Sequence, residues 1–310
     1  MDKLIKKTFN DIKSLKVQGA TAGAKTMGKS LADYGQRIKK QKVGEWQKEL
    51  KKAADYLLSA RPTDPMSQNV VKFIFSNLKK IQPQNVIQAK NYLKKFVNDF
   101  LLIAASGEDL IVSFGEKIIK NKENIFTHCH SSLVEKILEK AQSQEKKFEV
   151  FNTETRPLFQ GRITARELLK AKIPTTMVAD SSAGFLISRY SGQELMMDKI
   201  ILGADAIMQD GSVVNKIGSF TIALVAHQEK VPLYIATSLL KYHSHPQSLI
   251  KIEKRPPQEI WAQAPSGLKI INFAFDKIPP QYISGIICEA GIIKPKQIKE
   301  VTKKIYPFLN

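Results

Sequence analysis

The chain has 310 residues, enough for one large or two medium domains with a full hydrophobic core. Its apolar fraction of 43% and charged fraction of 25% are ordinary for a globular protein, and no apolar run approaches the roughly eighteen residues of a membrane span. The net charge of +19 comes mostly from lysines spread along the whole chain. This spread favours a lysine-rich solvated surface, with a weaker interpretation as a field that attracts phosphorylated small molecules or RNA.

The cysteines and the N-terminal segment indicate in which cellular compartment the protein is expected. Two cysteines, Cys129 and Cys288, cannot form a disulfide framework, and no residues have zinc-ligand spacing. The segment Met1–Lys7 lacks the apolar core of a signal peptide. We therefore expect a cytoplasmic protein with no membrane partner and no metal.

The N-terminal region, residues 1–120, has apolar residues at helical spacing. Breaks fall at Arg61–Pro65 and at Gln82-Pro83. The pattern predicts a bundle of four or five helices, the last a long one over 84–105. We expect this bundle to be a separate helical domain.

The pattern changes at Asn124 to short apolar strands alternating with helical segments. Strands are predicted at 124–128, 148–152, 174–179, 199–203, 232–237 and 283–288. Helices are predicted at 131–143, 163–171, 182–190, 217–229 and 296–306, and a hairpin at Asp210-Gly211. Strands joined by helical crossovers predict an α/β domain with a Rossmann-like, doubly wound parallel sheet over residues 121–310.

In such sheets ligands bind beyond the carboxyl ends of the strands, so the residues that follow each strand are the candidates. Cys129 follows the first strand, on a strand-to-helix turn where backbone N–H groups favour negative charge. Its thiol can there be shifted toward thiolate, or donate and accept protons near neutral pH. The structural alternative is a small buried apolar residue. A Cys–His pair with His128 or His130 is a further alternative.

Charged and nucleophilic groups follow the other strands as well: Arg156, Asp180, Asp205, Lys216 and Lys241. Each alone has a structural interpretation, such as Asp180 capping its helix or Lys216 as a solvated lysine. Jointly they predict a site for an anionic substrate that needs proton transfer. No glycine-rich nucleotide loop is present.

These strand-end segments resemble one protein family. The segments that carry the resemblance are Thr127–Ser131, Thr153–Pro157, Gly203–Asp205, Val214–Gly218 and Lys241–His243, with Val17–Ala20, Arg61–Thr63, Asn272–Asp276 and Pro279-Pro280. The family contains ribose-1,5-bisphosphate isomerase, methylthioribose-1-phosphate isomerase and the regulatory alpha, beta and delta subunits of initiation factor two B. The resemblance covers nearly the whole chain and is greatest to the archaeal ribose-1,5-bisphosphate isomerases.

The resemblance implies conversion of an aldose 1-phosphate to an open-chain ketose phosphate, with Cys129 and Asp205 as the catalytic residues. Ribose 1,5-bisphosphate would give ribulose 1,5-bisphosphate, with no metal or organic cofactor. Burial would push Asp205 toward protonation so that it donates to the ring oxygen, while Cys129 handles the proton at the second carbon. The implied substrate-binding residues are Gln18, Gly19, Ala20, Arg61, Ser131, Arg156, Asn215, Lys216 and Lys241.

Family members assemble through the sheet domain, so a homo-oligomer, either a dimer or a hexamer, is expected. AMP as an activator is left open. One position departs from the isomerases: Gln18 stands where they have an arginine that contacts substrate phosphate, and glutamine lacks the charge of that contact. The alternative is therefore a non-catalytic regulatory subunit of the initiation-factor branch, which would bind a translation factor or nucleic acid. Methylthioribose-1-phosphate isomerase is a third interpretation.

Overall fold

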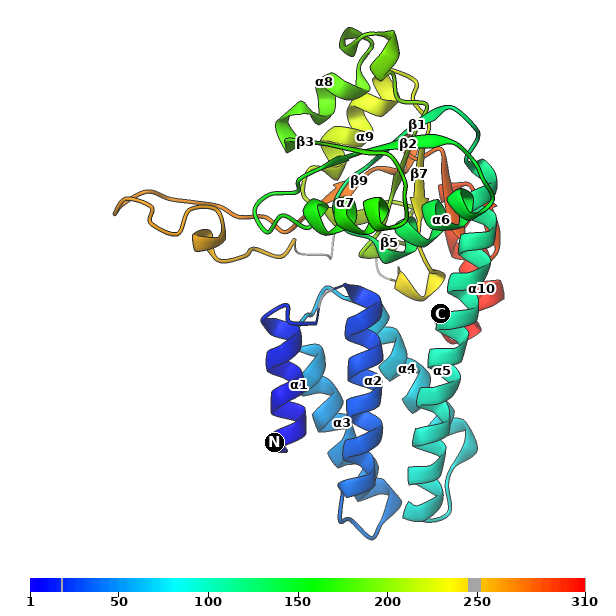
Figure 1. Cartoon of the computed structure of the whole chain (residues 1–310). Coiled ribbons are helices and arrows are strands. Elements are labelled where there is room, and N and C mark those ends of the chain that lie inside the picture. The colour runs from blue at the N-terminus through cyan, green and yellow to red at the C-terminus, as the bar shows by residue number, and fades with distance from the viewer. Residues whose placement is uncertain (18, 245–251, 310) are drawn as a thin grey trace. The chain divides into compact units, whose positions relative to one another are not determined.

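The computed structural model describes residues 1–17, 19–244 and 252–309, which fall into two compact units (Figure 1). The first unit comprises Met1–Ser106, Leu240–Tyr242 and the chain from Thr302 onward. The second comprises Gly107–Leu239 and His243–Val301. The sequence-based boundary at 120 therefore differs from the division between the units, which lies inside a helix.

The first unit is a helical bundle, as the apolar spacing predicts. Its helices are α1 (Lys3–Lys13), α2 (Ala20–Arg37), α3 (Val43–Leu58), α4 (Pro65–Ile81) and the first part of α5 (Val86–Gly115). Fully buried side chains such as Trp46, Leu50 and Phe100 form its core. Asp64 caps α4 by accepting from the backbone N–H groups of Met66 and Ser67, ahead of the proline at the first helical position.

Helix α5 continues ten residues beyond the predicted end at 105. The polar run Ser106–Asp109 does not end it, because Ile111 continues the apolar face and is fully buried. Gly107 is a packing glycine rather than a helix end. A Cβ there would lie 2.8 Å from Cγ of the buried Glu289.

The second unit is built on a seven-stranded sheet in the order β11-β10-β7-β4-β1-β2-β3. Its strands are β1 (Glu123–Thr127), β2 (Phe148–Thr153), β3 (Thr175–Val178), β4 (Lys199–Leu202), β7 (Leu233–Ala236), β10 (Gly285–Cys288) and β11 (Gly291–Ile293). All six predicted strands are present and pair in parallel, and only the edge strand β11 is antiparallel. This strand order is that of doubly wound dinucleotide-binding folds.

Helices cover both faces of this sheet (Figure 1). The end of α5, α6 (Ser132–Ser143) and α7 (Gly161–Lys170) pack on the face that presents Ile125, Val150 and Ile201. Helices α8 (Ala183–Ile187) and α9 (Ser219–Gln228) lie on the opposite face. The predicted α/β fold, a helical bundle plus a doubly wound parallel sheet, is thereby confirmed.

A second, smaller sheet has four strands in the order β8-β5-β6-β9. Its strands are β5 (Ala206–Met208), β6 (Val213–Lys216), β8 (Tyr242–His243) and β9 (Phe275–Ile278), and α10 (Ile298–Ile305) comes near the C-terminus. The predicted hairpin is confirmed: β5 and β6 are antiparallel around Asp210-Gly211. Among the described helices none is both long enough and apolar enough to cross a membrane.

Candidate active site

The candidate site lies at the point where the order of the parallel strands reverses. Strand β1 pairs with β2 on one side and with β4 on the other, so the connections that leave β1 and β4 diverge. Cys129 follows β1 and Asp205 follows β4. The two loops touch, because a Cβ added to Gly203 would lie 2.7 Å from Oγ of Ser131.

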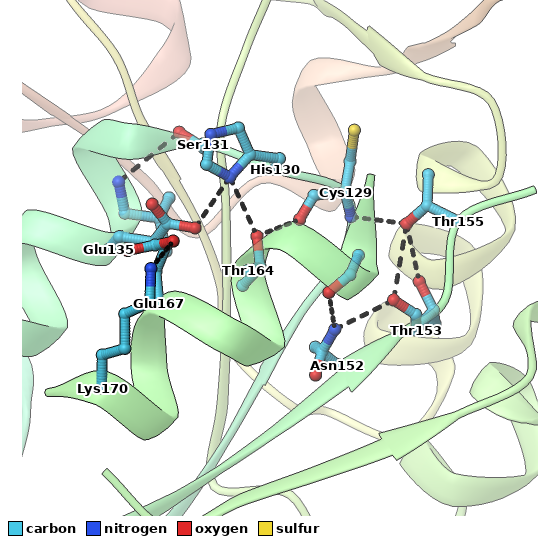
Figure 2. Close-up of polar contacts among 12 residues, drawn as sticks. Cys129, His130, Ser131, Glu135, Asn152, Thr153, Thr155, Thr164, Glu167 and Lys170 are labelled. Carbon is cyan, nitrogen blue, oxygen red and sulfur yellow. Dashed lines mark hydrogen bonds and ion pairs between the residues drawn. The ribbon is translucent and has the colours of Figure 1, made fainter. Parts of the chain in front are cut away.

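Cys129 has a left-handed backbone, with φ of 68°. Two threonines from other elements hold it there (Figure 2): its N–H donates to Oγ1 of Thr155 at 3.0 Å, and Oγ1 of Thr164 donates to its carbonyl at 3.0 Å. Ser131 then caps α6 by accepting from the N–H of Val134. Non-glycine residues seldom adopt this conformation unless their surroundings enforce it, and such residues cluster at functional sites.

Thr155, which accepts from Cys129, is itself left-handed, with φ of 62°. This conformation is a genuine outlier for a β-branched residue. Asp180, from the end of β3, accepts from the N–H groups of Thr155 at 2.8 Å and of Arg156 at 2.6 Å. The sequence-based interpretation of Asp180 as a helix cap is wrong, because its carboxylate is directed across to the loop after β2 rather than to its own 3₁₀ turn.

A buried histidine extends this hydrogen-bonded chain to α9. The Nε2 atom of His128 lies 2.9 Å from the carbonyl oxygen of Ile217, which can only accept, so Nε2 carries the proton. Nδ1 then accepts from the hydroxyl of Thr153 at 2.5 Å, and that hydroxyl lies 3.3 Å from Oγ1 of Thr155. Burial lowers the pKa of His128, so the ring stays neutral and acts as a link between the two loops.

His130 is held differently. Its Nδ1 lies 2.8 Å from Oε1 of Glu135 and 3.3 Å from Oγ1 of Thr164 (Figure 2). The hydrogen bond to Glu135 raises the pKa of His130, which favours an ion pair at the start of α6. Figure 2 shows the sulfur of Cys129 pointing away from this ring. The structure contradicts the alternative of a Cys–His pair. Both ring nitrogens of His128 bond to other groups, and His130 bonds to Glu135.

Cys129 is held as the protonated thiol. Burial raises its pKa to about 11, and the negative charges of Asp205 and Asp180 act in the same direction. The positive charge of Lys216 opposes them by favouring the thiolate. The expectation of a thiol shifted toward thiolate is not met, since the effect of burial on the pKa outweighs that of Lys216.

Lys216 is half-buried at the end of β6, with Nζ 5.3 Å from the centre of the Phe275 ring. The interpretation as a solvated helix-start lysine is wrong. Asn215 does not cap α9; its Nδ2 donates to Oγ of Ser219 at 2.9 Å, and that hydroxyl donates to the carbonyl of Lys216. The turn that carries Lys216 is therefore braced by side chains.

Asp276 on β9 braces the same turn by accepting from the N–H groups of Gly218 and Phe220 at 2.7 and 3.0 Å. Burial raises the pKa of Asp276 to about 6 despite these two bonds. The acid thus fixes the start of α9, to which the His128 link also runs.

Arg156 is exposed and forms part of a surface loop. Its Nη2 donates to the carbonyl of Ile260 at 2.9 Å, and its guanidinium lies 5.0 Å from the centre of the Phe159 ring. Ile260 belongs to a long segment, 254–272, that projects from this unit (Figure 1). A neutral carbonyl is a weaker partner for a guanidinium than a phosphate, so this contact is exchangeable.

The structure gathers six of the predicted site residues in the second unit: Cys129, Ser131, Arg156, Asp205, Asn215 and Lys216. Four others belong to the first unit: Gly19, Ala20, Arg61 and Lys241. Gly19, with φ of 80°, is the N-cap of α2, and Ala20 is its first residue. Gln18 lies outside the described residues.

Sequence reasoning gave no role to the residues that hold the candidate catalytic groups in place: His128, Thr153, Thr155, Thr164 and Asp276. It named Asp180 as a site candidate but did not predict that its carboxylate accepts from the backbone of the loop after β2. The only sequence signal for most of them was their position after a strand. Among the described residues no group of three or more His, Cys, Asp or Glu side chains is arranged to hold a metal ion.

Comparison with known proteins places this geometry in a family. Ribose 1,5-bisphosphate isomerase of Methanocaldococcus jannaschii is 34% identical over 99% of this chain and 97% of that protein. Methylthioribose-1-phosphate isomerase of Acetivibrio thermocellus is 31% identical over 94% and 89%. The crystal structure of a Pyrococcus horikoshii protein described as translation initiation factor eIF-2B superposes with a TM-score of 0.82 at 25% identity, covering 96% of this chain and 99% of that one.

The family model for the Initiation factor 2 subunit family matches residues 16–295, a span that covers most of both units and every residue of the candidate site. The predicted resemblance is confirmed. The chain belongs to the Initiation factor 2 subunit family.

Proposed function

We propose that this protein is a sugar-phosphate isomerase that converts an aldose 1-phosphate to a ketose phosphate, with ribose 1,5-bisphosphate as substrate and ribulose 1,5-bisphosphate as product. The observation that carries the proposal is the meeting of a thiol and a carboxylate, Cys129 and Asp205, at the switch point of the sheet, with Lys216 charged beside the thiol. The curated relatives named ribose 1,5-bisphosphate isomerase support the choice of substrate.

The proposed chemistry moves protons only. Asp205 donates a proton to the ring oxygen as the bond between that oxygen and C1 breaks. Cys129, as thiolate, removes the proton from C2 and returns it to C1. The hydroxyl proton on C2 goes back to Asp205 as the ketone forms, so both side chains end as they began. Because the pKa of the Cys129 thiol is raised, the cycle starts with transfer of the thiol proton to the Asp205 carboxylate, which then serves as the acid of the first step; Lys216 favours this transfer by stabilising the thiolate.

Cationic groups suit a bisphosphate. We propose that Arg156 exchanges its bond to Ile260 for one phosphate and that Lys216 serves an anionic group near the thiol. We assign substrate contacts also to Ser131 and Asn215, and to Gln18, Gly19, Ala20, Arg61 and Lys241 from the resemblance.

The assembled state is proposed as a dimer or hexamer of identical chains, which light scattering tests. AMP is proposed as a candidate activator, which assays with added AMP test.

The test is turnover of ribose 1,5-bisphosphate by purified protein, followed by proton NMR in deuterated water. Cys129→Ser and Asp205→Asn should each lower kcat by about 10² to 10⁴-fold while the protein stays folded. Two matched controls should retain activity: Cys288→Ser, at the buried cysteine of β10, and Asp210→Asn, at the hairpin tip. Wild-type activity that survives both active-site changes would contradict the assigned roles.

A second candidate is a non-catalytic regulatory subunit, favoured by the structural match to a protein described as a translation initiation factor and by the uncharged Gln18. It predicts a folded protein that binds a phosphorylated ligand yet turns over no pentose 1-phosphate. Replacement of Gln18 by arginine separates the two: gain of turnover would identify an isomerase site weakened at one contact, and no gain would favour the regulatory subunit.

A further inference from the structure

Asp180 makes an unusual pair of hydrogen bonds. Its Oδ1 accepts from the N–H of Thr155 at 2.8 Å and its Oδ2 accepts from the N–H of Arg156 at 2.6 Å. Two consecutive backbone donors are thus held by the two oxygens of one carboxylate, across 24 to 25 residues of chain. Charge-assisted bonds of this kind are stronger than neutral ones, so this loop is fixed firmly.

The loop needs such an anchor because of its conformation. Thr155 has φ of 62°, which disfavours any β-branched side chain. Its hydroxyl is committed to the N–H of Cys129 on one side and to Thr153 on the other. If the backbone of Thr155 left this conformation, it would therefore disturb the turn of Cys129. It would also move the backbone from which the Arg156 side chain extends.

We propose that Asp180 is a positioning residue of the site: by holding the Thr155–Arg156 backbone it aims Arg156 at a substrate phosphate and keeps the Thr155 hydroxyl under the turn of Cys129. This inference rests on the proposed function for the role of Arg156. It assigns to Asp180 no contact with substrate.

A matched control exists at the other end of the same sheet. Asp198 also accepts from a backbone N–H, that of Asn124, at 2.8 Å, but it does so at the amino end of β1. Removal of either carboxylate deletes a side chain that bonds the main chain. Only Asp180 bonds a loop of the candidate site.

The first measurement is the affinity for inorganic phosphate and for ribose 1,5-bisphosphate, by calorimetry, in Asp180→Ala, Arg156→Ala and the double variant. Asp180→Ala should weaken binding by about 10 to 100-fold, the range that a misplaced binding group causes. In the Arg156→Ala background the same change should have little further effect, because both act through one contact. Asp180→Glu should bind with intermediate affinity, and Asp198→Ala should match wild type.

Additive effects of Asp180→Ala and Arg156→Ala, or equal losses in Asp198→Ala, would overturn the proposal. Thermal unfolding separates folding from positioning: if Asp180→Ala is unfolded, Asp180→Asn replaces it, since asparagine keeps one acceptor but turns an N–H toward the second backbone donor.

The second measurement does not depend on substrate. Alkylation of Cys129 by iodoacetamide at pH 8 should become about threefold faster, or more, in Asp180→Ala, because loss of a nearby carboxylate favours the thiolate. The buried Cys288 reports unfolding in the same sample. Wild-type protein that binds neither phosphate nor the bisphosphate would overturn the proposed function. Because Asp180→Asn loses the same charge but keeps one acceptor, it is the reference: a different rate in Asp180→Ala than in Asp180→Asn would support the positioning role at the Cys129 turn, and equal rates in the two variants would overturn it.

Discussion

The two ends of the central strands are built from the same kinds of residues but organised differently. At the amino end, Lys199 on β4 is buried, with Nζ 2.5 Å from Oε2 of Glu123 and 2.5 Å from the carbonyl of Ile118. The charges there neutralise one another. At the carboxyl end, the thiol and the charges of Asp205, Asp180 and Lys216 influence one another. Three residues there that are not glycine, Cys129, Thr155 and Phe159, are left-handed.

The two ends differ in how their left-handed residues are held. At the amino end the left-handed residues Lys122, Glu145, Lys172 and Lys230 lie in exposed turns ahead of strands. The carboxyl end keeps Cys129 and Thr155 in disfavoured conformations, held by hydrogen bonds from α7 and β3. Strain maintained in this way is typical of sites where geometry matters more than stability.

The largest expected effect is at the amino end. Lys199→Met leaves the carboxylate of Glu123, only 13% exposed, without its cation, and loss of one partner of a largely buried pair lowers the free energy of unfolding by about 3 to 5 kcal/mol. Urea unfolding measures this change. Lys170→Met, at an exposed pair with Glu167, should change it by less than about 1 kcal/mol. Equal changes in the two variants would contradict the contrast.

The next effect is at the carboxyl end, at Gly161, where α7 begins. A Cβ there would lie 1.7 Å from the carbonyl oxygen of Thr153, so backbone must shift. Gly161→Ala should lower the free energy of unfolding by about 1 to 3 kcal/mol and also weaken phosphate binding, since Thr153 leads into Thr155 and Arg156. Gly44→Ala, with open space around it, is the control. Unaltered phosphate affinity in Gly161→Ala would show that the start of α7 does not influence phosphate binding at the site.

The carboxyl end of the strands should also make both activity and stability depend on pH, through Cys129. Burial raises the pKa of Cys129 from about 9 to about 11. Between pH 7 and pH 9 the thiolate fraction, and with it kcat/KM, should rise about tenfold per pH unit if Cys129 acts as base. The free energy of unfolding should change in the opposite direction, because the folded state holds the thiol proton of Cys129 more tightly than the unfolded state does. The contribution of this proton to stability is full below pH 9 and is lost as the pH rises toward 11. A flat rate profile would argue against Cys129 as the base.

The smallest expected effect concerns Lys216. Lys216→Met removes the positive charge that lowers the pKa of Cys129, so the alkylation of Cys129 should slow by about two- to fivefold at pH 8. Lys254→Met is a matched control, because that lysine also lies over a phenylalanine ring, Phe273. A faster reaction in Lys216→Met would show that Lys216 shields the thiol rather than favouring its thiolate.

The sequence could predict much of this arrangement because the relevant signals are local. Apolar periodicity located all six parallel strands and the helices between them. Once the strands are known, the rule that ligands bind at carboxyl ends puts Cys129 and Asp205 among the candidates, together with Arg156, Asp180, Lys216 and Lys241. Their catalytic roles remain predictions from the family resemblance.

What the sequence alone determined was therefore the order of elements, the fold class and the residues that follow each strand, since these depend on neighbours within a few positions. Only the tertiary structure decided which loops meet. Asp180 reads as a helix cap in isolation, yet it bonds Thr155 and Arg156. The His128 link and the raised pKa of Cys129 likewise arise from groups tens of residues away, because hydrogen bonding and burial depend on distance in space rather than along the chain.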